Sequence, residues 1–254
     1  MNIAHKRIVV TGAASGIGLE LVKALVAFEG VSVLAADLAP LTFQHKTVQF
    51  YQVDCSTQIG NDSLFTHAET ILGGVDILFA NAGFAYYETI KKADYQHIEA
   101  IFRVNTFAPI YGFEWMKTTQ TQETVTVMTA SAMAQLGIPG YALYAATKAA
   151  LNRFADAYWF EPQTNARLML VYPVATRSNF FKNSVSSAKI PVTPFPSNSP
   201  QFVAKCMIEG VQKGKKRVFP SLLFRVSLVF NQLFSWLAWP YQTFYAKKLN
   251  EFIK

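Results

Sequence analysis

The sequence is poor in cysteine and in charge. Only two cysteines, Cys55 and Cys206, occur among 254 residues, and they lie far apart, so they form neither a four-cysteine zinc site nor a disulfide framework. We expect both thiols to be reduced and packed in apolar surroundings, and we predict no metal site. Charged residues make up 15% of the chain and hydrophobic residues 51%, which excludes an intrinsically disordered protein.

Basic charge is scarce in the body of the chain and concentrated near its end. Up to Ala204 there are 14 basic and 14 acidic residues, whereas residues 205–254 contain 9 and 2. A uniformly basic nucleic-acid-binding protein has a different distribution, so we expect no nucleic-acid partner. A neutral body with a basic, apolar tail is typical of a protein that meets a membrane surface or an acidic partner. The first residues lead directly into a strand-like segment, so we expect no signal peptide and a cytoplasmic protein.

Short apolar runs alternate with longer amphipathic stretches over the first two thirds of the chain. Six runs are predicted as strands, over residues 7–10, 31–36, 48–53, 77–80, 124–128 and 168–172. They are apolar at consecutive positions, which is typical of strands covered on both faces. Helices are predicted notably over 17–28, 95–117, 144–160 and 200–212, and a short strand after the basic run 213–217. This alternation predicts one α/β domain over residues 1–220, with a Rossmann-like doubly wound parallel sheet and helices on both faces, followed by a helical extension over 221–254.

A glycine-rich turn, TGAASGIG at residues 11–18, joins the first predicted strand to the first helix. Glycine is required where the backbone approaches a pyrophosphate and where a helix packs closely on a strand. The N-terminus of the helix offers free N–H groups and the positive end of its dipole to phosphates. The spacing differs from the G-x-G-x-x-G fingerprint, so a dinucleotide-binding turn and a tight turn without a ligand both stay open.

Asp37 ends the second predicted strand, about twenty residues beyond the glycines. Its carboxylate can accept hydrogen bonds from the ribose hydroxyls of an adenosine, and its charge repels a 2′-phosphate. No Lys or Arg follows Asp37 directly or lies between Gly12 and Gly18. Charge therefore favours NAD over NADP, the alternative being that Asp37 is only a solvated residue at a strand end.

Several motifs follow the glycine turn in a fixed order. Asp54 lies after the third predicted strand, Asn81-Ala82-Gly83 after the fourth, and Tyr144-x-x-x-Lys148 begins thirteen positions beyond Ser131. Together with the turn and with Asn105, these motifs resemble the short-chain dehydrogenase/reductase family over about residues 5–220. The resemblance implies an NAD(P)-binding oxidoreductase that pairs through its Y-x-x-x-K helix as a homodimer or homotetramer. It implies cofactor contacts at Gly12, Ser15, Gly16, Ile17, Gly18, Asp37, Asp54, Asn81, Ala82, Gly83, Tyr144, Lys148, Pro173 and Ser178.

The chemistry of hydride transfer gives roles to these residues. Moving a hydride between an alcohol carbon and nicotinamide also requires moving the hydroxyl proton, and a tyrosine pKa of about 10 is too high for a base at neutral pH. Lys148 lies four residues beyond Tyr144 on the same helix face, so its ammonium, together with the positive charge of an oxidised nicotinamide, is expected to lower that pKa. We predict Tyr144 as the acid/base, Lys148 as its electrostatic tuner and a ribose ligand, and Ser131 as a hydrogen-bond donor to the substrate oxygen. Asn105 is expected to hold a water that relays protons from Lys148. Taken singly, each of these residues also has an ordinary structural role as the alternative. The Tyr–Lys pair can lie on the surface, the serine can end a strand, and the asparagine can cap or bend its helix.

One segment departs from the family pattern. The family has Pro-Gly and then a Thr that holds the nicotinamide carboxamide, whereas this chain has Pro173-Val174 and, at the Thr position, Ser178. With valine at position 174, a positive φ is energetically unfavourable, and the side chain adds bulk near the nicotinamide. The resemblance assigns the hydroxyl role to Ser178 and leaves the conformation of the loop as the open question.

The predicted substrate pocket is apolar. It draws on residues 84–87, 132–141 and 180–195, with Met133, Ile138 and Phe180 expected beside Ser131 and Tyr144. An apolar lining favours a lipophilic alcohol or ketone over a sugar or hydroxy acid. The alternative is that several of these side chains are core residues.

The tail over residues 220–245 has no charge between Arg225 and Lys247. It is nearly long enough to span a bilayer, but its helical periodicity predicts one amphipathic helix instead. The polar side gathers Arg225, Ser227, Asn231, Gln232 and Ser235, and the apolar side gathers Leu222, Leu223, Val226, Val229, Phe230, Leu233, Phe234, Trp236 and Leu237, with Leu228 as the exception. Three locations stay open for the apolar face: over the substrate pocket, on a second subunit, or in a membrane interface, which the aromatic residues and flanking lysines favour.

These patterns predict an NAD-dependent enzyme that interconverts a lipophilic secondary alcohol and its ketone, either cytoplasmic or peripheral on the inner face of a membrane. A non-catalytic dinucleotide sensor or scaffold of the same fold is the alternative, and the intact set of Ser131, Tyr144 and Lys148 argues against it. An RNA-binding protein has less support because basic and stacking residues do not interleave in the tail.

Overall fold

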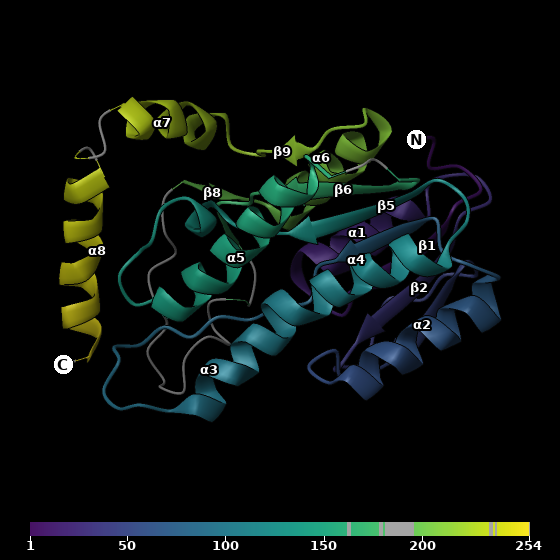
Figure 1. Ribbon diagram of the computed structural model, residues 1–254, viewed down its shortest axis with the longest axis horizontal. Helices are drawn as coiled ribbons and strands as arrows, with labels where there is room; N and C mark the ends of the chain where they lie inside the picture. Colours follow the sequence, from purple (N-terminus) through teal and green to yellow (C-terminus); the bar gives the residue numbers. More distant parts are fainter. Residues whose placement is uncertain (162–163, 178–179, 181–195, 234–235, 237, 254) are drawn as a thin grey trace.

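Seven parallel strands form one sheet in the order β3-β2-β1-β4-β5-β6-β9 (Figure 1). The computed structural model describes residues 1–161, 164–177, 180, 196–233, 236 and 238–253. The strands are β1 (Arg7–Thr11), β2 (Ser32–Asp37), β3 (Val48–Gln52), β4 (Ile77–Ala80), β5 (Thr124–Thr129), β6 (Ala166–Val171) and β9 (Arg217–Val218). The order reverses between β1 and β4, so a crevice opens there at the carboxyl ends of the strands. Two short segments, β7 (Ala175–Thr176) and β8 (Ser197–Asn198), pair separately.

Helices cover both faces of the sheet, which confirms the predicted doubly wound fold (Figure 1). α1 (Gly16–Leu25) and α6 (Pro200–Gln212) pack on one face, and α2 (Gln58–Leu72), α4 (Ala108–Thr119) and α5 (Ala142–Tyr158) pack on the other. Successive residues of β1 serve both layers: Ile8 and Val10 lie in the core under α1, and Val9 lies in the core under α2 and α4. The remaining short elements are α3 (Tyr95–Phe102), η1 (Arg103–Phe107) and η2 (Ala132–Ala134).

Two predicted elements differ from the structure. The run over 48–53 was expected to be covered on both faces, but β3 is the edge strand and its residues Gln49, Phe50 and Gln52 are exposed. The single helix expected over 95–117 is interrupted by the π-helical turn η1. Cys55 is buried and Cys206 is half-buried, and both are free thiols; burial raises the pKa of Cys55 to about 12.

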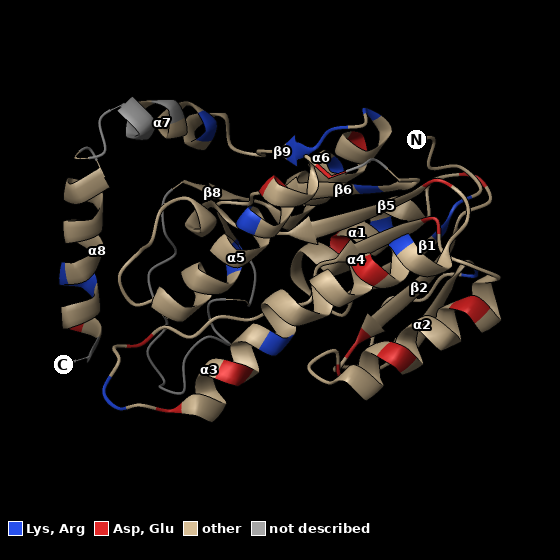
Figure 2. Cartoon of the chain, viewed as in Figure 1, with Lys and Arg blue, Asp and Glu red and all other residues tan. Residues whose placement is uncertain are grey.

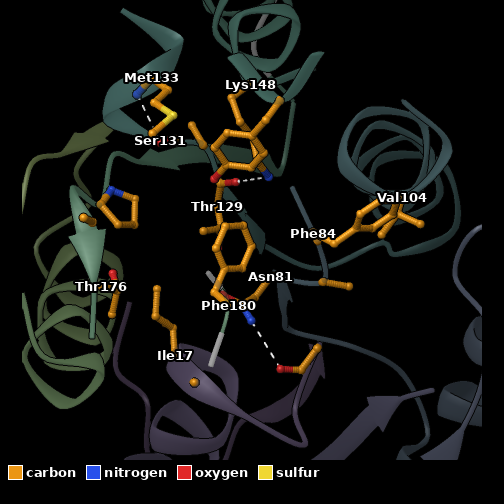
Figure 3. A pocket seen from close by; sticks show the side chains of 18 of the residues that line it. Ile17, Asn81, Phe84, Val104, Thr129, Ser131, Met133, Lys148, Thr176 and Phe180 are labelled. Atoms are coloured by element: carbon orange, nitrogen blue, oxygen red, sulfur yellow. Dashed lines mark hydrogen bonds between the residues drawn. The ribbon is translucent and has the colours of Figure 1, made fainter. Parts of the chain in front are cut away.

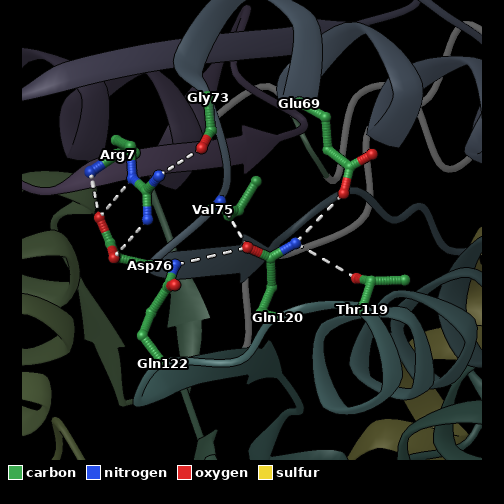
Figure 4. Close-up of polar contacts among 8 residues, drawn as sticks. All are labelled: Arg7, Glu69, Gly73, Val75, Asp76, Thr119, Gln120 and Gln122. Carbon is green, nitrogen blue, oxygen red and sulfur yellow. Dashed lines mark hydrogen bonds and ion pairs between the residues drawn. The ribbon is translucent and has the colours of Figure 1, made fainter.

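An ion pair fixes the sheet at the end opposite the crevice (Figure 4). The guanidinium of Arg7, at the start of β1, donates from Nε and Nη2 to the two carboxylate oxygens of Asp76, each at 3.0 Å. Burial alone would raise the pKa of Asp76, but the hydrogen bonds and charge of Arg7 lower it. Gln120, after α4, accepts from the backbone N–H of Val75 at 3.1 Å. The start of β1, the segment before β4 and the end of α4 are thus joined at this end of the sheet.

The predicted C-terminal helical extension is present, and it consists of two helices, α7 (Leu222–Leu233) and α8 (Ala238–Ile253), rather than one (Figure 1). Phe224 of α7 is buried, and Leu228 packs beside it on the core under α5. Tyr245 and Leu249 of α8 are buried in a separate cluster with Tyr144. Within the described residues, no helix is both long and apolar enough to cross a membrane.

Candidate active site

The glycine turn lies at the carboxyl end of β1, where the crevice begins. Gly12 and Gly16 adopt φ angles of +68° and +55°, in the left-handed region that favours glycine. A Cβ at Gly18 would lie 1.9 Å from the carbonyl oxygen of Gly12, so only glycine lets α1 pack this closely on the turn. The hydroxyl of Thr11 accepts from the backbone N–H groups of Asn81 and Ala82, both at 3.1 Å, and thereby ties the segment after β4 to the turn.

Asp37 is held at the wall of the crevice by two backbone hydrogen bonds. Its Oδ2 accepts from the N–H of Ala14 at 2.8 Å, and its Oδ1 accepts from the N–H of Ala39 at 2.9 Å. The first bond connects the end of β2 directly to the glycine turn. Asp54, the other predicted adenosine contact, lies exposed on the same wall, where its Oδ1 accepts from the N–H of Ser56 at 2.8 Å.

Ser131, Tyr144 and Lys148 meet at the opposite end of the crevice. Ser131 follows β5 and caps η2 by accepting from the N–H of Met133 at 3.1 Å, and the other two residues lie one turn apart on α5. All three are buried, with Lys148 only 3% exposed. The Lys148 Nζ donates to the carbonyl oxygen of Thr129 at 2.8 Å and lies 5.7 Å from the centre of the Tyr144 ring. The predicted set is therefore brought together.

Burial is the main influence on the pKa values of Tyr144 and Lys148. Burial raises the pKa of Tyr144 to about 12, although a hydrogen bond with Ser131 acts in the opposite direction. Burial also lowers the pKa of Lys148 to about 7. For these residues by themselves, removal from water disfavours both charged forms; that the ammonium of Lys148 and an oxidised nicotinamide together lower the pKa of Tyr144 stays a prediction.

Asn105 lies in the π-helical turn η1 and is fully buried. Its Oδ1 accepts from the N–H of Phe84 at 3.0 Å, and its Nδ2 donates to the carbonyl oxygen of Phe84 at 2.8 Å and to the hydroxyl of Thr147 at 3.2 Å. The side chain thus joins the segment after β4 to α5, beside Gly83. A π-turn is a common device at functional sites because it redirects one residue within a helix. That Asn105 holds a relay water stays a prediction.

One cavity of about 1480 Å³ contains both ends of this site. Figure 3 shows Ile17 of α1 at one end and Ser131, Met133 and Lys148 at the other, with Phe180 between them. The predicted cofactor contacts that line the cavity are Gly12, Ser15, Gly16, Ile17, Asp37, Asp54, Asn81, Ala82, Gly83, Tyr144, Lys148 and Pro173. Gly18 lies behind them as a packing residue.

The substrate end of the cavity is mainly apolar. Met133 and Ile138 line it as predicted, and the ring of Phe180 lies 5.6 Å from that of Tyr144. Of the predicted segment 84–87 only Phe84 reaches the cavity, since Tyr86 stacks on His97 and Tyr87 packs against Tyr141. Residues 181–195 lie outside the described part of the chain.

The loop after β6 accommodates valine where the family has glycine. Among the described residues His5 is the only non-glycine residue with a positive φ, so Val174 adopts an ordinary backbone conformation. Its side chain is buried with the core under α5 and also borders the cavity. Ser178, predicted to replace the family threonine, lies outside the described residues. Thr176, two positions earlier, lines the cavity instead, and its hydroxyl donates to the carbonyl oxygen of Val174 at 3.1 Å.

Residues of the tail were not predicted to line the cavity individually, but several do. They are Leu223, Phe224, Val226, Ser227, Phe230, Ala238 and Tyr241. The periodicity of the tail left a position over the substrate pocket open, and no motif in the sequence singles out these residues. Polar side chains of α3 and η1 were also missed, those of Gln96, Glu99 and Arg103; Arg103 pairs with Glu99 at 3.0 Å.

Comparison with known proteins agrees with this geometry. The family described as short chain dehydrogenase matches residues 6–189. A Mycobacterium tuberculosis protein named as an oxidoreductase, SadH, is 26% identical over 84% of this chain and 85% of its own length. A 3-dehydrosphinganine reductase from Danio rerio is 25% identical over 84% of this chain and 70% of its own length. An uncharacterised oxidoreductase of Schizosaccharomyces pombe is 26% identical over 60% of this chain and 66% of its own length.

Solved structures share the fold. A short-chain dehydrogenase/reductase from Burkholderia phymatum in complex with NAD superposes with a TM-score of 0.77 at 17% identity, covering 91% of this chain and 94% of that one. A short-chain dehydrogenase from Burkholderia cenocepacia in complex with NADP superposes with a TM-score of 0.73 at 19% identity, covering 94% and 97%. One of these two proteins holds NAD and the other NADP.

Proposed function

Because the chain belongs to the short-chain dehydrogenase family and is thus an oxidoreductase, we propose that it uses NAD(H) to interconvert a lipophilic secondary alcohol and its ketone. The observation that carries this proposal is the single cavity that joins the glycine turn after β1 to the buried group of Ser131, Tyr144 and Lys148. A glycine turn alone can serve only to pack a helix on a strand, and a buried tyrosine alone can be a core residue. A nucleotide-binding turn and a buried acid that face one space are what hydride transfer requires.

The residues around the glycine turn fit a dinucleotide. The N–H groups in the first turn of α1 have no carbonyl acceptor within the helix, so they are free to bind a phosphate. Gly12 and Gly16, with positive φ angles, carry no side chain that would cover the backbone beside them. A Cβ at Gly12 would lie 2.8 Å from the Cα of Ala82, so this cradle depends on glycine. When bound, the nicotinamide supplies or accepts the hydride.

Asp37 supports a preference for NAD over NADP. Both carboxylate oxygens are fixed by backbone N–H groups, so the charge cannot turn away from the cavity wall without losing hydrogen bonds. A ribose 2′-hydroxyl can donate to such an oxygen, whereas a 2′-phosphate would meet a negative charge. The structures in complex with NAD and with NADP show that the fold itself accommodates either dinucleotide, so the preference rests on this residue.

Tyr144 is proposed to transfer the proton. With its pKa raised to about 12 by burial, Tyr144 is a neutral phenol at pH 7 and can donate to a ketone oxygen as the alcohol forms. We propose that Ser131 donates a second hydrogen bond to the same oxygen. Lys148, with a pKa lowered to about 7, exchanges protons readily near neutral pH and lies beside the Tyr144 ring. These residues favour ketone reduction at neutral pH.

The class of substrate is inferred from the cavity wall. Met133, Ile138, Phe180 and the tail residue Tyr241 present mostly apolar surface around Tyr144. An apolar wall with few polar groups selects a hydrocarbon-like substrate whose ketone is its principal polar group. The likeness to a protein named 3-dehydrosphinganine reductase supports the same class.

The test is a screen of NADH oxidation with medium-chain, sphingoid, steroid and retinoid ketones, followed with the same panel by the Tyr144→Phe variant. We expect turnover with at least one apolar ketone, a loss of about a thousandfold or more in kcat on substitution, and unchanged NADH binding by fluorescence. A wild-type protein that binds NADH but reduces none of these ketones would favour the non-catalytic alternative. A Tyr144→Phe variant that turns over normally would refute Tyr144 as the proton donor.

A further inference from the structure

The two tail helices expose several large apolar side chains, which together are here called the tail strip. Its members are Leu222, Leu223, Val226, Phe230, Trp236, Trp239 and Phe244. Trp236 and Trp239 are 68% and 70% exposed, and Leu222 is 72% exposed. Several large apolar side chains exposed on two consecutive helices are typical of a surface that meets a membrane or another protein.

The orientation of α7 is fixed by its inward side, so the exposure of the tail strip is a feature of the packed fold. Phe224 is 7% exposed and packs with Leu228 against the core beneath α5. The backbone N–H of Phe224 also donates to the hydroxyl of Ser221 at 3.2 Å, which caps the start of the helix. α8 is anchored likewise: Tyr245 and Leu249 are buried, and the side chain of Gln242 donates to the carbonyl oxygen of Gly137 at 3.0 Å.

The tail strip is continuous with the rim of the substrate cavity. Leu223, Val226 and Phe230 line the cavity, yet they are 57%, 46% and 51% exposed, so they stand between the cavity and the outside. α7 and α8 lie at the same end of the molecule (Figure 1). Whatever covers the tail strip therefore also covers the mouth through which a substrate reaches Tyr144.

The charge around the tail strip is basic. No charged residue occurs between Arg225 and Lys247, and the charged residues of α7 and α8 are Arg225, Lys247 and Lys248 against one acidic residue, Glu251. Figure 2 shows the basic positions on α7 and α8, with acidic character only near the end of α8. Arg225 and Lys247 are exposed, and in the part of the chain that the structure describes neither takes part in an ion pair. Basic residues flanking apolar and Trp-rich helices suit the headgroup region of an anionic bilayer.

We propose that the tail strip docks on an anionic lipid bilayer and turns the mouth of the substrate cavity toward the acyl chains. A second copy or another protein seated on Leu223, Val226 and Phe230 would close the mouth, whereas a bilayer covers the strip and also holds lipophilic molecules. The identity of the delivered molecule as a ketone or alcohol rests on the proposed function; the docking does not.

The first test is flotation of the full chain with vesicles of phosphatidylcholine containing about a third phosphatidylserine, and with vesicles of phosphatidylcholine alone. The variant Trp236→Gln/Trp239→Gln removes two residues of the tail strip that do not line the cavity. The matched control Ile59→Gln/Phe160→Gln removes two side chains that are 82% and 94% exposed elsewhere. We expect the wild type and the control to bind the anionic vesicles, the tail variant to bind at least about tenfold more weakly, and salt to weaken binding further.

The second test compares turnover of a water-soluble ketone with that of a long-chain ketone dissolved in the anionic vesicles. The tail variant should keep its rate with the soluble ketone and lose at least about fivefold with the bilayer-held one. Absence of wild-type vesicle binding, equal binding by the tail variant, or equal binding to neutral vesicles would overturn the docking. A tail variant that changes only the sedimentation mass would assign the strip to a second copy and overturn it as well. Vesicle binding without turnover of any ketone would refute the proposed function and leave the docking in place.

Discussion

Replacing Lys148 by methionine is expected to stabilise the fold while removing activity. Lys148 is 3% exposed, and burial lowers its pKa from 10.5 to about 7. Between these two values the unfolded chain binds a proton that the folded chain does not, so stability rises with pH across this window and is lowest at and below pH 7. At about 1.4 kcal/mol per pH unit, the buried amine costs the folded state about 4 kcal/mol at pH 7 and about 1 kcal/mol at pH 10.

The measurement must separate this effect from lost contacts. Methionine removes the hydrogen bond from Lys148 Nζ to the carbonyl oxygen of Thr129, which costs about 1–3 kcal/mol at either pH. Urea unfolding therefore measures the change in unfolding free energy caused by Lys148→Met at pH 7 and again at pH 10. We expect this change to favour the variant by about 3 kcal/mol more at pH 7 than at pH 10. Lys23→Met, at an exposed amine on α1, is the control and should show no such difference. If Lys148→Met changes stability equally at both pH values, the inference of a desolvated amine is refuted.

Three further outcomes follow from the site. Gly18→Ala should lower the free energy of unfolding by about 1–3 kcal/mol and weaken NADH binding, because its Cβ would lie 1.9 Å from the carbonyl oxygen of Gly12; urea titration and NADH fluorescence check this. Asp37→Asn keeps one oxygen that can accept from the N–H of Ala14 but loses the charge, so the ratio of kcat/KM for NADP to that for NAD should rise at least about tenfold in steady-state assays. With the pKa of Tyr144 at about 12, the rate of alcohol oxidation should rise up to about tenfold per pH unit from neutral pH, while ketone reduction stays flat; a flat oxidation profile would contradict Tyr144 as the base.

The parallel sheet was predictable because its signal is local. Strands such as Ile77–Ala80 are apolar at every position, and this pattern requires cover on both faces whatever the rest of the chain does. The order of the strands is not local, so the sequence could not show that Val48–Gln52 forms the edge and is half exposed. The π-turn at Asn105 could not be predicted for a related reason: the Asn105 side chain forms hydrogen bonds to Phe84 and Thr147, which only the folded chain brings within reach.

The membership of the site was predictable, whereas its electrostatics were not. Spacing along one helix places Tyr144 and Lys148 on one face, and the order of the motifs puts Ser131 nearby. Spacing does not reveal how much water is removed. The pKa of Tyr144 is raised and that of Lys148 lowered because both are buried, so proximity of an amine to a phenol is not sufficient to activate the phenol. In this chain the ground state favours the neutral phenol, which is the form that reduction consumes.

The limits of helical periodicity also explain why the location of the apolar face of the tail could not be predicted. It shows which residues share a helix face, but it cannot show which face meets the body. An ordinary amphipathic helix buries its broad apolar side, yet here the body contacts the narrow side through Phe224 and Leu228, one turn apart. Leu223, Val226 and Phe230 are then left exposed at the rim of the cavity, while α8 buries Tyr245 and Leu249 against the substrate end of the same cavity. The proposed docking on a bilayer would give these exposed side chains an apolar cover, and because Leu223, Val226 and Phe230 also line the cavity, the same bilayer would be the source of a lipophilic substrate.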